Sequence, residues 1–541
     1  MLTAMRIRNF KSFGPDGDWF PMGPLTLILG ENSSGKSTIL QALLLLSQSW
    51  QEPLQYLDLS GDGKHLKIGP MSNHRHRGRA DAHEFGFRLG RADVVLEYRV
   101  ANDAGPAKLR MLKTKFDDTV AAEWEPTVNL ANPAEVEWRM RNTRAWLATQ
   151  DGQEARELEG AIAAADTAFD IDSQEKVQND IEDLDYDMPS SHLEALQRLP
   201  ELTEPQKIRF DLVVVQTPED LRFGCRVSPA SFLAPYGVAF DRERIPYATV
   251  RVEEFDMESG IPEVTELASL LEQHWSVVRQ LRDLLAGTAY IGPMRSPGKR
   301  VYVDAPNPSR IPYVGSDGRF LVHALSESGT ELQAKVNRSL RRQEIPYELS
   351  VKTLGPSTGA LIAKRQRQGG LNDGDSGECV DLCDVGFGVS QSLPVTAQWE
   401  ILRHHPAVAG EGTRALVVEQ PELHLHPRWQ AELASALCDV WPIARADETD
   451  YEDTALGLTA RTQAIVETHS ELMVLRIARL VRTGELRPDE NGQLPVVVLS
   501  AGRDGGCTEV RCVPIDDDGW FDRRQFFEGF FVDRVDEEMA T

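Results

Sequence analysis

The stretch that most constrains the fold is residues 25–38, LTLILGENSSGKST. The apolar run 25–29 predicts a buried strand, and the apolar residues after Ser37 predict a helix from Thr38 to about Ser47. Between them, residues 30–37 match the phosphate-binding pattern G-x-x-x-x-G-K-[ST]. A glycine turn that fits this pattern by chance is the alternative, and the flanking strand and helix argue against it. The stretch therefore predicts an α/β domain with an anion site at a strand-to-helix turn.

The chemistry of this loop predicts a nucleotide with its metal ion. Glycines let the backbone wrap closely around phosphates, and the N–H groups of the loop and of the helix N-terminus favour negative charge. Lys36 is expected to reach the β- and γ-phosphates, and the Ser37 hydroxyl to bind Mg²⁺. The residues expected to bind ATP here are Gly30, Glu31, Asn32, Ser33, Ser34, Gly35, Lys36, Ser37 and Thr38.

Composition narrows the possible partners. The 541 residues carry a formal net charge of −26 and are 41% hydrophobic, which is typical of a soluble globular protein. The charge argues against a non-specific coat on nucleic acid or an anionic membrane. The longest apolar runs are too short to cross a bilayer, and the N-terminus has no signal-peptide core. We therefore expect a cytoplasmic protein that binds no membrane.

The chain is long enough for several domains, and its character changes along its length. The acidic residues 151–204 show helical apolar spacing only in patches and predict an exposed arm. The expected divisions are an N-terminal ATPase lobe (1–110), an inserted acidic helical or mixed arm (111–285), a return segment (286–375), a C-terminal ATPase lobe (376–495) and a short strand and aromatic segment (496–541).

Several basic groups stand out in this acidic chain. They are residues 73–79 (NHRHRGR), Arg295 with Lys299 and Arg300, the end of a predicted helix at 326–342, and Lys364 with Arg365. Scattered surface charge is the default interpretation of such groups. A local patch that contacts nucleic acid, whether DNA or RNA, is the alternative.

A second block of polar residues lies far along the chain. Residues 415–419 (ALVVE) predict an apolar strand that ends in Glu419, a carboxylate suited to Mg²⁺. Residues 464–470 (AIVETHS) predict another strand, after which His469 could polarise a γ-phosphate. Residues 384–392 (DVGFGVSQS) predict a glycine-rich loop before a helix, which is a second anion site by the same argument. Sites so far apart imply a mostly parallel sheet with a large insertion.

Together these blocks resemble the ABC-type ATPase head, in particular that of the stand-alone bacterial AAA ATPases related to overcoming-lysogenisation-defect (OLD) nucleases and to SMC proteins. The runs that carry the resemblance are RIRNFKSF, GENSSGKST, VGFGVSQSLPV, EQPELHLHP and ETHSE, and the aromatic run WFDRRQFFEGFF is similar to a segment found in some of these ATPases. The resemblance implies an ABC-ATPase head: a mostly parallel sheet with helices plus an antiparallel subdomain.

The resemblance also implies roles for residues. Ser37 and Glu419 would serve Mg²⁺, and His469 would be the switch histidine. Gly386, Gly388, Ser390 and Gln391 would form the signature loop. In this family that loop meets the γ-phosphate held by a second subunit, so that two ATP molecules lie between two heads. A head-to-head homodimer or a higher homo-oligomer is therefore expected.

Two departures from the family pattern affect the expected activity. Gly386 stands where these heads usually carry a serine. Gln420 stands where the catalytic glutamate is usual, and an amide can orient water but cannot accept its proton at neutral pH. Either Gln420 serves a slow hydrolysis or Glu422 substitutes for the missing carboxylate. Slow hydrolysis suits a switch that ATP holds closed.

The expected function is an ATP-binding, slowly hydrolysing switch that controls a separately encoded effector, a nuclease or a toxin, in bacterial anti-phage defence. A DNA-tethering or repair ATPase of SMC type is one alternative, although no sustained heptad pattern appears between residues 51 and 380. An OLD-like nuclease is another, although the strand predicted at residues 496–499 lacks the acidic residue that its metal site needs.

Overall fold

The computed structural model describes residues 1–49, 57, 65–66, 74–76, 82–100, 107–116, 122–128, 136–140, 210–216, 221–227, 249–251, 276–303, 311–355, 358–365, 379–404, 413–438, 462–489, 492–516 and 518–527. Contacts divide the chain into two units. One consists of residues 1–109 and 279–541, and the other of residues 110–278. The predicted acidic arm at 151–204 lies outside the described residues, so its helical character stays a prediction.

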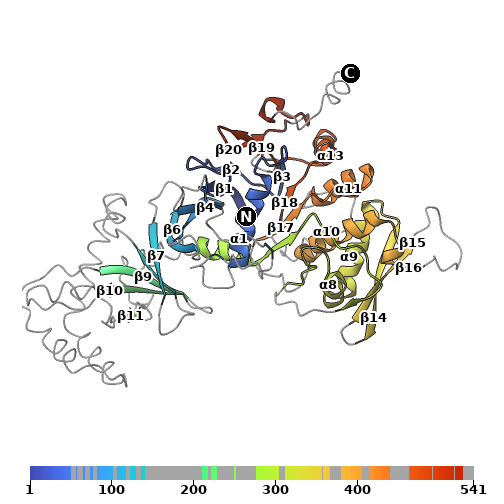
Figure 1. Ribbon diagram of the computed structural model, residues 1–541, viewed down its shortest axis with the longest axis horizontal. Coiled ribbons are helices and arrows are strands. Elements are labelled where there is room, and N and C mark those ends of the chain that lie inside the picture. The colour runs from blue at the N-terminus through green and yellow to red at the C-terminus, as the bar shows by residue number, and fades with distance from the viewer. Residues whose placement is uncertain are drawn as a thin grey trace, which may run out of the picture. The chain divides into compact units, whose positions relative to one another are not determined.

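The first unit is built on a six-stranded sheet (Figure 1). Its strands, in spatial order, are β12 (Thr288–Ile291), β17 (Arg414–Glu419), β18 (Thr462–Glu467), β3 (Leu25–Leu29), β19 (Val496–Asp504) and β20 (Cys507–Val513). The first five run parallel, and β20 returns antiparallel to β19. The α/β class with a mostly parallel sheet is therefore confirmed.

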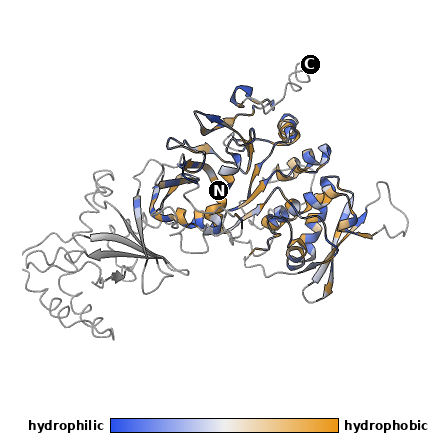
Figure 2. Cartoon of the chain, viewed as in Figure 1, coloured by the Kyte–Doolittle hydropathy of each residue, from blue (hydrophilic) through white to orange (hydrophobic). Residues whose placement is uncertain are grey.

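Burial explains why the central strands read as continuous apolar runs. Every residue of β3 and β18 is buried, as expected for parallel strands that are covered on both faces. Helix α1 (Lys36–Ser49) follows β3, and α10 (Phe387–His404) is buried from Val389 to Leu402. Figure 2 shows hydrophobic residues along the central strands and a mixture on α11 (Pro427–Cys438) and α13 (Glu471–Arg482).

Two antiparallel groups complete this unit. The strands β2 (Phe20–Pro21), β1 (Leu2–Arg8), β4 (Ala82–Leu89) and β5 (Ala92–Val100) pair in that order. Beside α8 (Leu321–Glu327) and α9 (Gly329–Arg342), strand β15 (Thr358–Arg365) pairs with β13 (Tyr302–Val303), β14 (Tyr347–Gly355) and β16 (Cys379–Asp381). The antiparallel subdomain expected from the resemblance is thus present.

The second unit contains an antiparallel meander. Most of β6 (Ala107–Phe116) belongs to it, followed by β7 (Ala122–Val128), β8 (Val136–Met140), β9 (Phe210–Gln216), β10 (Leu221–Val227) and β11 (Thr249–Arg251). Each strand pairs with the next along the chain. Among the described helices of the whole chain, none is both long and apolar enough to cross a bilayer.

One buried glutamine joins the two kinds of sheet in the first unit. Gln463 lies on β18 and is fully buried. Its Oε1 accepts a hydrogen bond from the backbone N–H of Leu2 at 2.8 Å, and its Nε2 donates to the carbonyls of Leu2 and Gly23 at 2.8 and 2.9 Å. This one side chain therefore hydrogen-bonds backbone groups at the start of β1 and in the turn before β3.

Gln463→Leu is expected to destabilise the protein by about 2–4 kcal/mol, because three buried backbone groups would each lose a hydrogen bond. Gln493→Leu is the matched control, since the side chain of Gln493 is exposed, and a change there is expected to cost under about 0.5 kcal/mol. The measurement is urea unfolding followed by circular dichroism. Equal midpoints for the two variants would contradict the role of Gln463.

Candidate functional site

The phosphate loop has the backbone that its glycines predict. Gly30 and Gly35 adopt φ of 142° and 109°, which L side chains rarely adopt. A Cβ on Gly35 would also lie 2.1 Å from Thr508 Oγ1, so the glycine is required by contact as well as by conformation. Helix α1 begins at Lys36, slightly before the predicted start at Thr38. The N-terminus of α1 and the loop N–H groups thus face one site, as anion binding requires.

Lys36 is held against its own loop. Its Nζ donates to the carbonyl of Gly30 at 2.9 Å and to that of Glu31 at 2.6 Å. Burial lowers the pKa of Lys36, and the nearby carboxylates of Glu467 and Glu31 act in the opposite direction. The ammonium is therefore in position beside the loop and has acceptors that phosphate oxygens could replace.

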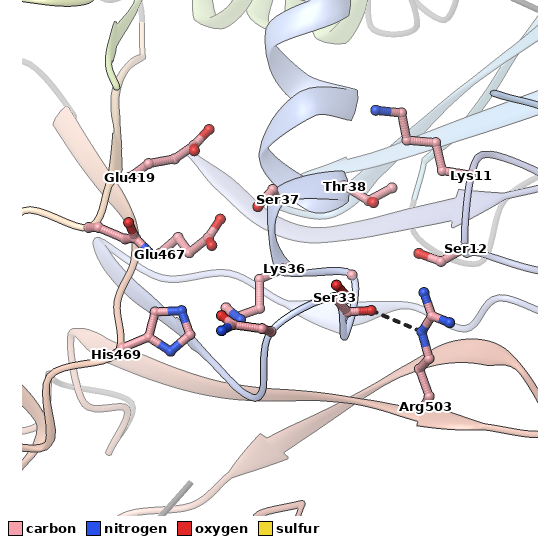
Figure 3. A pocket seen from close by; sticks show the side chains of 13 residues that line it. Lys11, Ser12, Ser33, Lys36, Ser37, Thr38, Glu419, Glu467, His469 and Arg503 are labelled. Carbon is pink, nitrogen blue, oxygen red and sulfur yellow. Dashed lines mark hydrogen bonds between the residues drawn. The ribbon is translucent and has the colours of Figure 1, made fainter. Parts of the chain in front are cut away.

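A cavity of about 430 Å³ opens at this loop (Figure 3). Its lining residues are Lys11, Ser12, Asn32, Ser33, Gly35, Lys36, Ser37, Thr38, Glu419, Gln420, Glu467, His469 and Arg503. It brings together most of the predicted phosphate-loop residues with three of the four predicted catalytic ones. Of the loop residues, Gly30, Glu31 and Ser34 do not line it, although the first two accept hydrogen bonds from Lys36.

The hairpin of β19 and β20 contacts carbonyls of the loop through two side chains. Arg503 Nε donates to the Ser33 carbonyl at 2.9 Å (Figure 3). Thr508 Oγ1 lies 2.9 Å from the Ser34 carbonyl and 2.7 Å from Ser12 Oγ. The prediction from sequence missed these residues. Of Arg503, Thr508 and Ser12, only Ser12 carried a signal in the sequence, because it lies within the RIRNFKSF run.

Two carboxylates share the edge of the sheet opposite Ser37. Glu419 ends β17 and Glu467 ends β18, and the two residues are direct partners in the parallel ladder. Burial raises the pKa of Glu419 to about 7, and the charge of Glu467 adds to this effect, whereas a hydrogen bond from the Tyr290 hydroxyl opposes it. Burial also raises the pKa of Glu467, while a hydrogen bond with Ser37 lowers it. The sequence had indicated only Glu419 here.

These oxygens fit a divalent cation of the kind that accompanies ATP. Glu467 Oε2 is buried and has no hydrogen-bond partner among the described residues. Carboxylates and a hydroxyl are the hard donors that Mg²⁺ prefers. When bound, such an ion neutralises charge on the β- and γ-phosphates. Ser37 and Glu419 are the two ligands expected from the sequence, and both line the cavity.

Of the other predicted catalytic residues, Gln420 and His469 line the cavity and Glu422 does not. Gln420 has a φ of 45°, and its backbone N–H donates to the Glu467 carbonyl at 2.7 Å. His469 lines the cavity, and burial, together with the charge of Lys36, lowers its pKa. Glu422 does not line the cavity. Its carboxylate accepts hydrogen bonds from the Thr468 hydroxyl at 2.8 Å and the His469 N–H at 2.7 Å, so it fixes the turn that carries the histidine.

The predicted signature residues do not join this cavity within one chain. The sequence predicted a loop at these positions, and this prediction is wrong. The helix α10 begins at Phe387, so Gly388, Ser390 and Gln391 lie in its first turns. Ser390 Oγ donates to the Phe387 carbonyl at 2.8 Å. Gln391 is buried, and its Nε2 donates to the Arg295 carbonyl at 3.2 Å. Around Gly386, the space that a Cβ would occupy is open.

Arg295 connects the signature helix to the end of β17. Its guanidinium donates to the carbonyls of Gly292, Gln391 and Pro421 at 3.2, 2.9 and 3.3 Å, and also contacts the carbonyls of Glu419 and Gln420. Burial lowers its pKa to about 10, which the charge of Glu422 opposes. Only 5% of the residue is exposed, so the idea that Arg295 belongs to a nucleic-acid patch is wrong.

The other basic groups named in the sequence lie in different surroundings. Arg300 forms ion pairs with Asp381 at 2.8 Å and Asp384 at 2.9 Å. Of the basic run 73–79, the structure describes His74, Arg75 and His76, which line a second hollow beside Lys11 and Arg503.

Arg295→Met is expected to destabilise the protein by at least about 3 kcal/mol, because several buried carbonyls would lose a charged donor. Arg295→Lys is expected to rescue little of this loss, since one ammonium cannot reproduce the planar fork. Arg300→Met, which removes an exposed ion-pairing arginine, is expected to cost under about 1 kcal/mol. Thermal unfolding of the three variants compares them, and a fully stable Arg295→Lys protein would contradict this account.

Comparison with known proteins agrees with this site. A family model described as "AAA domain" matches residues 4–53, and one described as "AAA domain, putative AbiEii toxin, Type IV TA system" matches residues 328–475. The first covers the phosphate loop, and the second covers α10, β17 and His469. No curated protein matches the chain.

Three solved structures illustrate the similarity to SMC heads. The Smc head with an extended coiled coil bound to the C-terminal domain of ScpA, from Pyrococcus furiosus, is 9% identical over 100% of this chain and 99% of that chain, with a TM-score of 0.34. The Smc head with a coiled coil and joint from Pyrococcus yayanosii is 10% identical over 95% and 97%, with a TM-score of 0.34. The SMC head from Thermotoga maritima is 9% identical over 95% and 99%, with a TM-score of 0.31.

The mixed α/β sheets fit an ABC-ATPase head fold, and the two AAA matches, together with the geometry of the phosphate loop, support an ABC/AAA-type ATPase with an ATP-binding site.

Proposed function

We propose that the protein is an ATP-dependent switch: it binds ATP with Mg²⁺, dimerises head to head around the nucleotide and hydrolyses it slowly. The phosphate loop, Glu419 and His469 would provide one half of each site. The signature residues at the start of α10 would provide the other half from a second copy. A change in the amount of dimer would then report whether ATP is bound.

The observation that carries this proposal is the separation of the two halves. In one chain the cavity contains the phosphate loop but none of the predicted signature residues. The start of α10 is nevertheless accessible, because Phe387 is 47% exposed and a side chain on Gly386 would meet no atom within 4 Å. A second copy could therefore present this helix N-terminus to a γ-phosphate, where N–H groups favour an anion.

Slow hydrolysis follows from the position of Gln420. It lines the cavity directly after the acid strand, where its amide can hold a water molecule but cannot take its proton. Glu422 is engaged with Thr468 and His469 and does not line the cavity, which favours Gln420 as the residue that faces the water. The dimer would consequently persist for long after ATP binds.

For the biological role, we propose control of a separately encoded effector, a nuclease or toxin, in bacterial anti-phage defence. The sequence blocks that resemble defence ATPases support this role. The net charge of −26 favours a protein partner with a basic face, because complementary charge steers association. Arg295 is buried and Arg300 is paired with an acid, so neither is well placed to bind DNA phosphates, and DNA tethering is not favoured as the main activity.

The central test is light scattering with and without ATP·Mg²⁺, with phosphate release followed on the same sample. The wild-type protein is expected to form a larger species with ATP and to turn over slowly. Gln420→Glu is expected to speed phosphate release at least about tenfold, because it restores a proton acceptor. Lys36→Ala is expected to abolish both effects. Fast wild-type hydrolysis by a species whose mass ignores ATP would refute the switch.

A second test uses the open space at Gly386. Gly386→Ser is expected to strengthen ATP-dependent dimerisation by about tenfold, because one added hydroxyl can hydrogen-bond a charged phosphate. Gly386→Ala adds the same Cβ without the hydroxyl and is the matched control. Dimer dissociation constants from sedimentation, with ATP present, give the comparison. If serine and alanine act alike, the side chain at this position does not contact the nucleotide.

A further inference from the structure

Glu467 is a buried carboxylate inside the cavity at the phosphate loop, and the sequence motifs predict no role for it. It is the last residue of β18, and only 5% of it is exposed. Its side chain lines the cavity and points toward Ser37, between Glu419 and Lys36 (Figure 3). Its backbone carbonyl accepts the N–H of Gln420 at 2.7 Å, so the position of the residue is fixed by the neighbouring strand end.

The two carboxylate oxygens of Glu467 are in different situations. The side chain accepts a hydrogen bond from the Ser37 hydroxyl. Oε2 is buried and has no hydrogen-bond partner among the described residues. A buried anionic oxygen without a partner is costly, and proteins rarely keep one without a ligand. The free oxygen therefore indicates a bound group that is positively charged.

Glu419 is a second carboxylate that lines the same cavity. It is the direct ladder partner of Glu467, so both side chains leave the same face of the sheet. The Tyr290 hydroxyl donates to Glu419 Oε1 at 3.0 Å and leaves the other oxygen of that carboxylate available to a ligand. Two carboxylates side by side repel each other, and a cation between them and a hydroxyl removes that repulsion.

We propose that Glu467 binds the divalent cation of the ATP site together with Ser37 and Glu419, as a second acidic ligand from the strand that precedes the switch histidine. The inference rests on the proposed function, because the cation arrives with the nucleotide. A purely structural Glu467 would only hold the Ser37 hydroxyl. A glutamine can accept that hydrogen bond through its amide oxygen, so Glu467→Gln separates the two roles.

The experiment is titration calorimetry with the non-hydrolysable analogue AMP-PNP, in Mg²⁺ and in excess chelator, on the full chain. For Glu467→Gln, the gain in affinity that Mg²⁺ provides is expected to fall at least about tenfold. Affinity without metal is expected to rise, because one negative charge beside the phosphates is gone. A structural role predicts no change in the Mg²⁺ gain, and an unchanged Mg²⁺ gain in Glu467→Gln would overturn the proposal.

Three further variants make the result unambiguous. Glu400→Gln neutralises another buried glutamate, which pairs with Arg403 and His404 away from the cavity, and it is expected to leave both affinities unchanged. Glu467→Asp keeps the charge and is expected to retain most of the Mg²⁺ gain, which tests the proposal even if the glutamine variant does not fold. Lys36→Ala is expected to lose AMP-PNP binding with or without metal.

The two hypotheses fail in different ways. If the wild-type protein binds no AMP-PNP in either condition, the proposed function fails, and this inference with it. If the wild-type protein binds AMP-PNP with a strong Mg²⁺ gain that Glu467→Gln retains in full, or that Glu467→Asp loses in full, only this inference fails.

Discussion

The parallel register of β17, β18 and β3 is the constraint on which the site depends. Parallel strands end at one edge of a sheet, so the residues that follow them meet there although they are far apart in sequence. Here the phosphate loop follows β3, Glu419 ends β17 and Glu467 ends β18. A shift of one residue in the ladder between β17 and β18 would move one carboxylate to the opposite face. The chemistry of the cavity is thus fixed by backbone hydrogen bonds.

Local patterns predicted a large part of this arrangement. The strand 25–29 and the strand ending at Glu419 both appear in the structure, because continuous apolar runs report burial directly. The glycine pattern predicted the loop backbone for a different reason, because the positive φ at Gly30 and Gly35 excludes most side chains. The start of α10 was misjudged, because glycines in the first helical turn read as a loop.

The residues that sequence did not reveal act through distant partners. Arg295 looked like surface charge but is buried against backbone carbonyls of three segments. Gln463 and Arg503 likewise bond to atoms more than 400 positions away. No local periodicity encodes such contacts, because a polar side chain has the same appearance in sequence whether it faces water or a buried carbonyl. Glu467 likewise depends on a distant partner, because its place beside Glu419 comes from the pairing of β17 with β18.

The position of β3 has a consequence for synthesis. This strand comes early in the chain, yet both of its neighbours in the sheet, β18 and β19, lie beyond residue 460. The carbonyls of the phosphate loop are likewise braced by Arg503 and Thr508. A ribosome adds residues in order, so the loop emerges long before the strands and side chains that surround it in the folded protein. The surroundings of the phosphate loop are therefore complete only after synthesis has passed the last strands of the sheet.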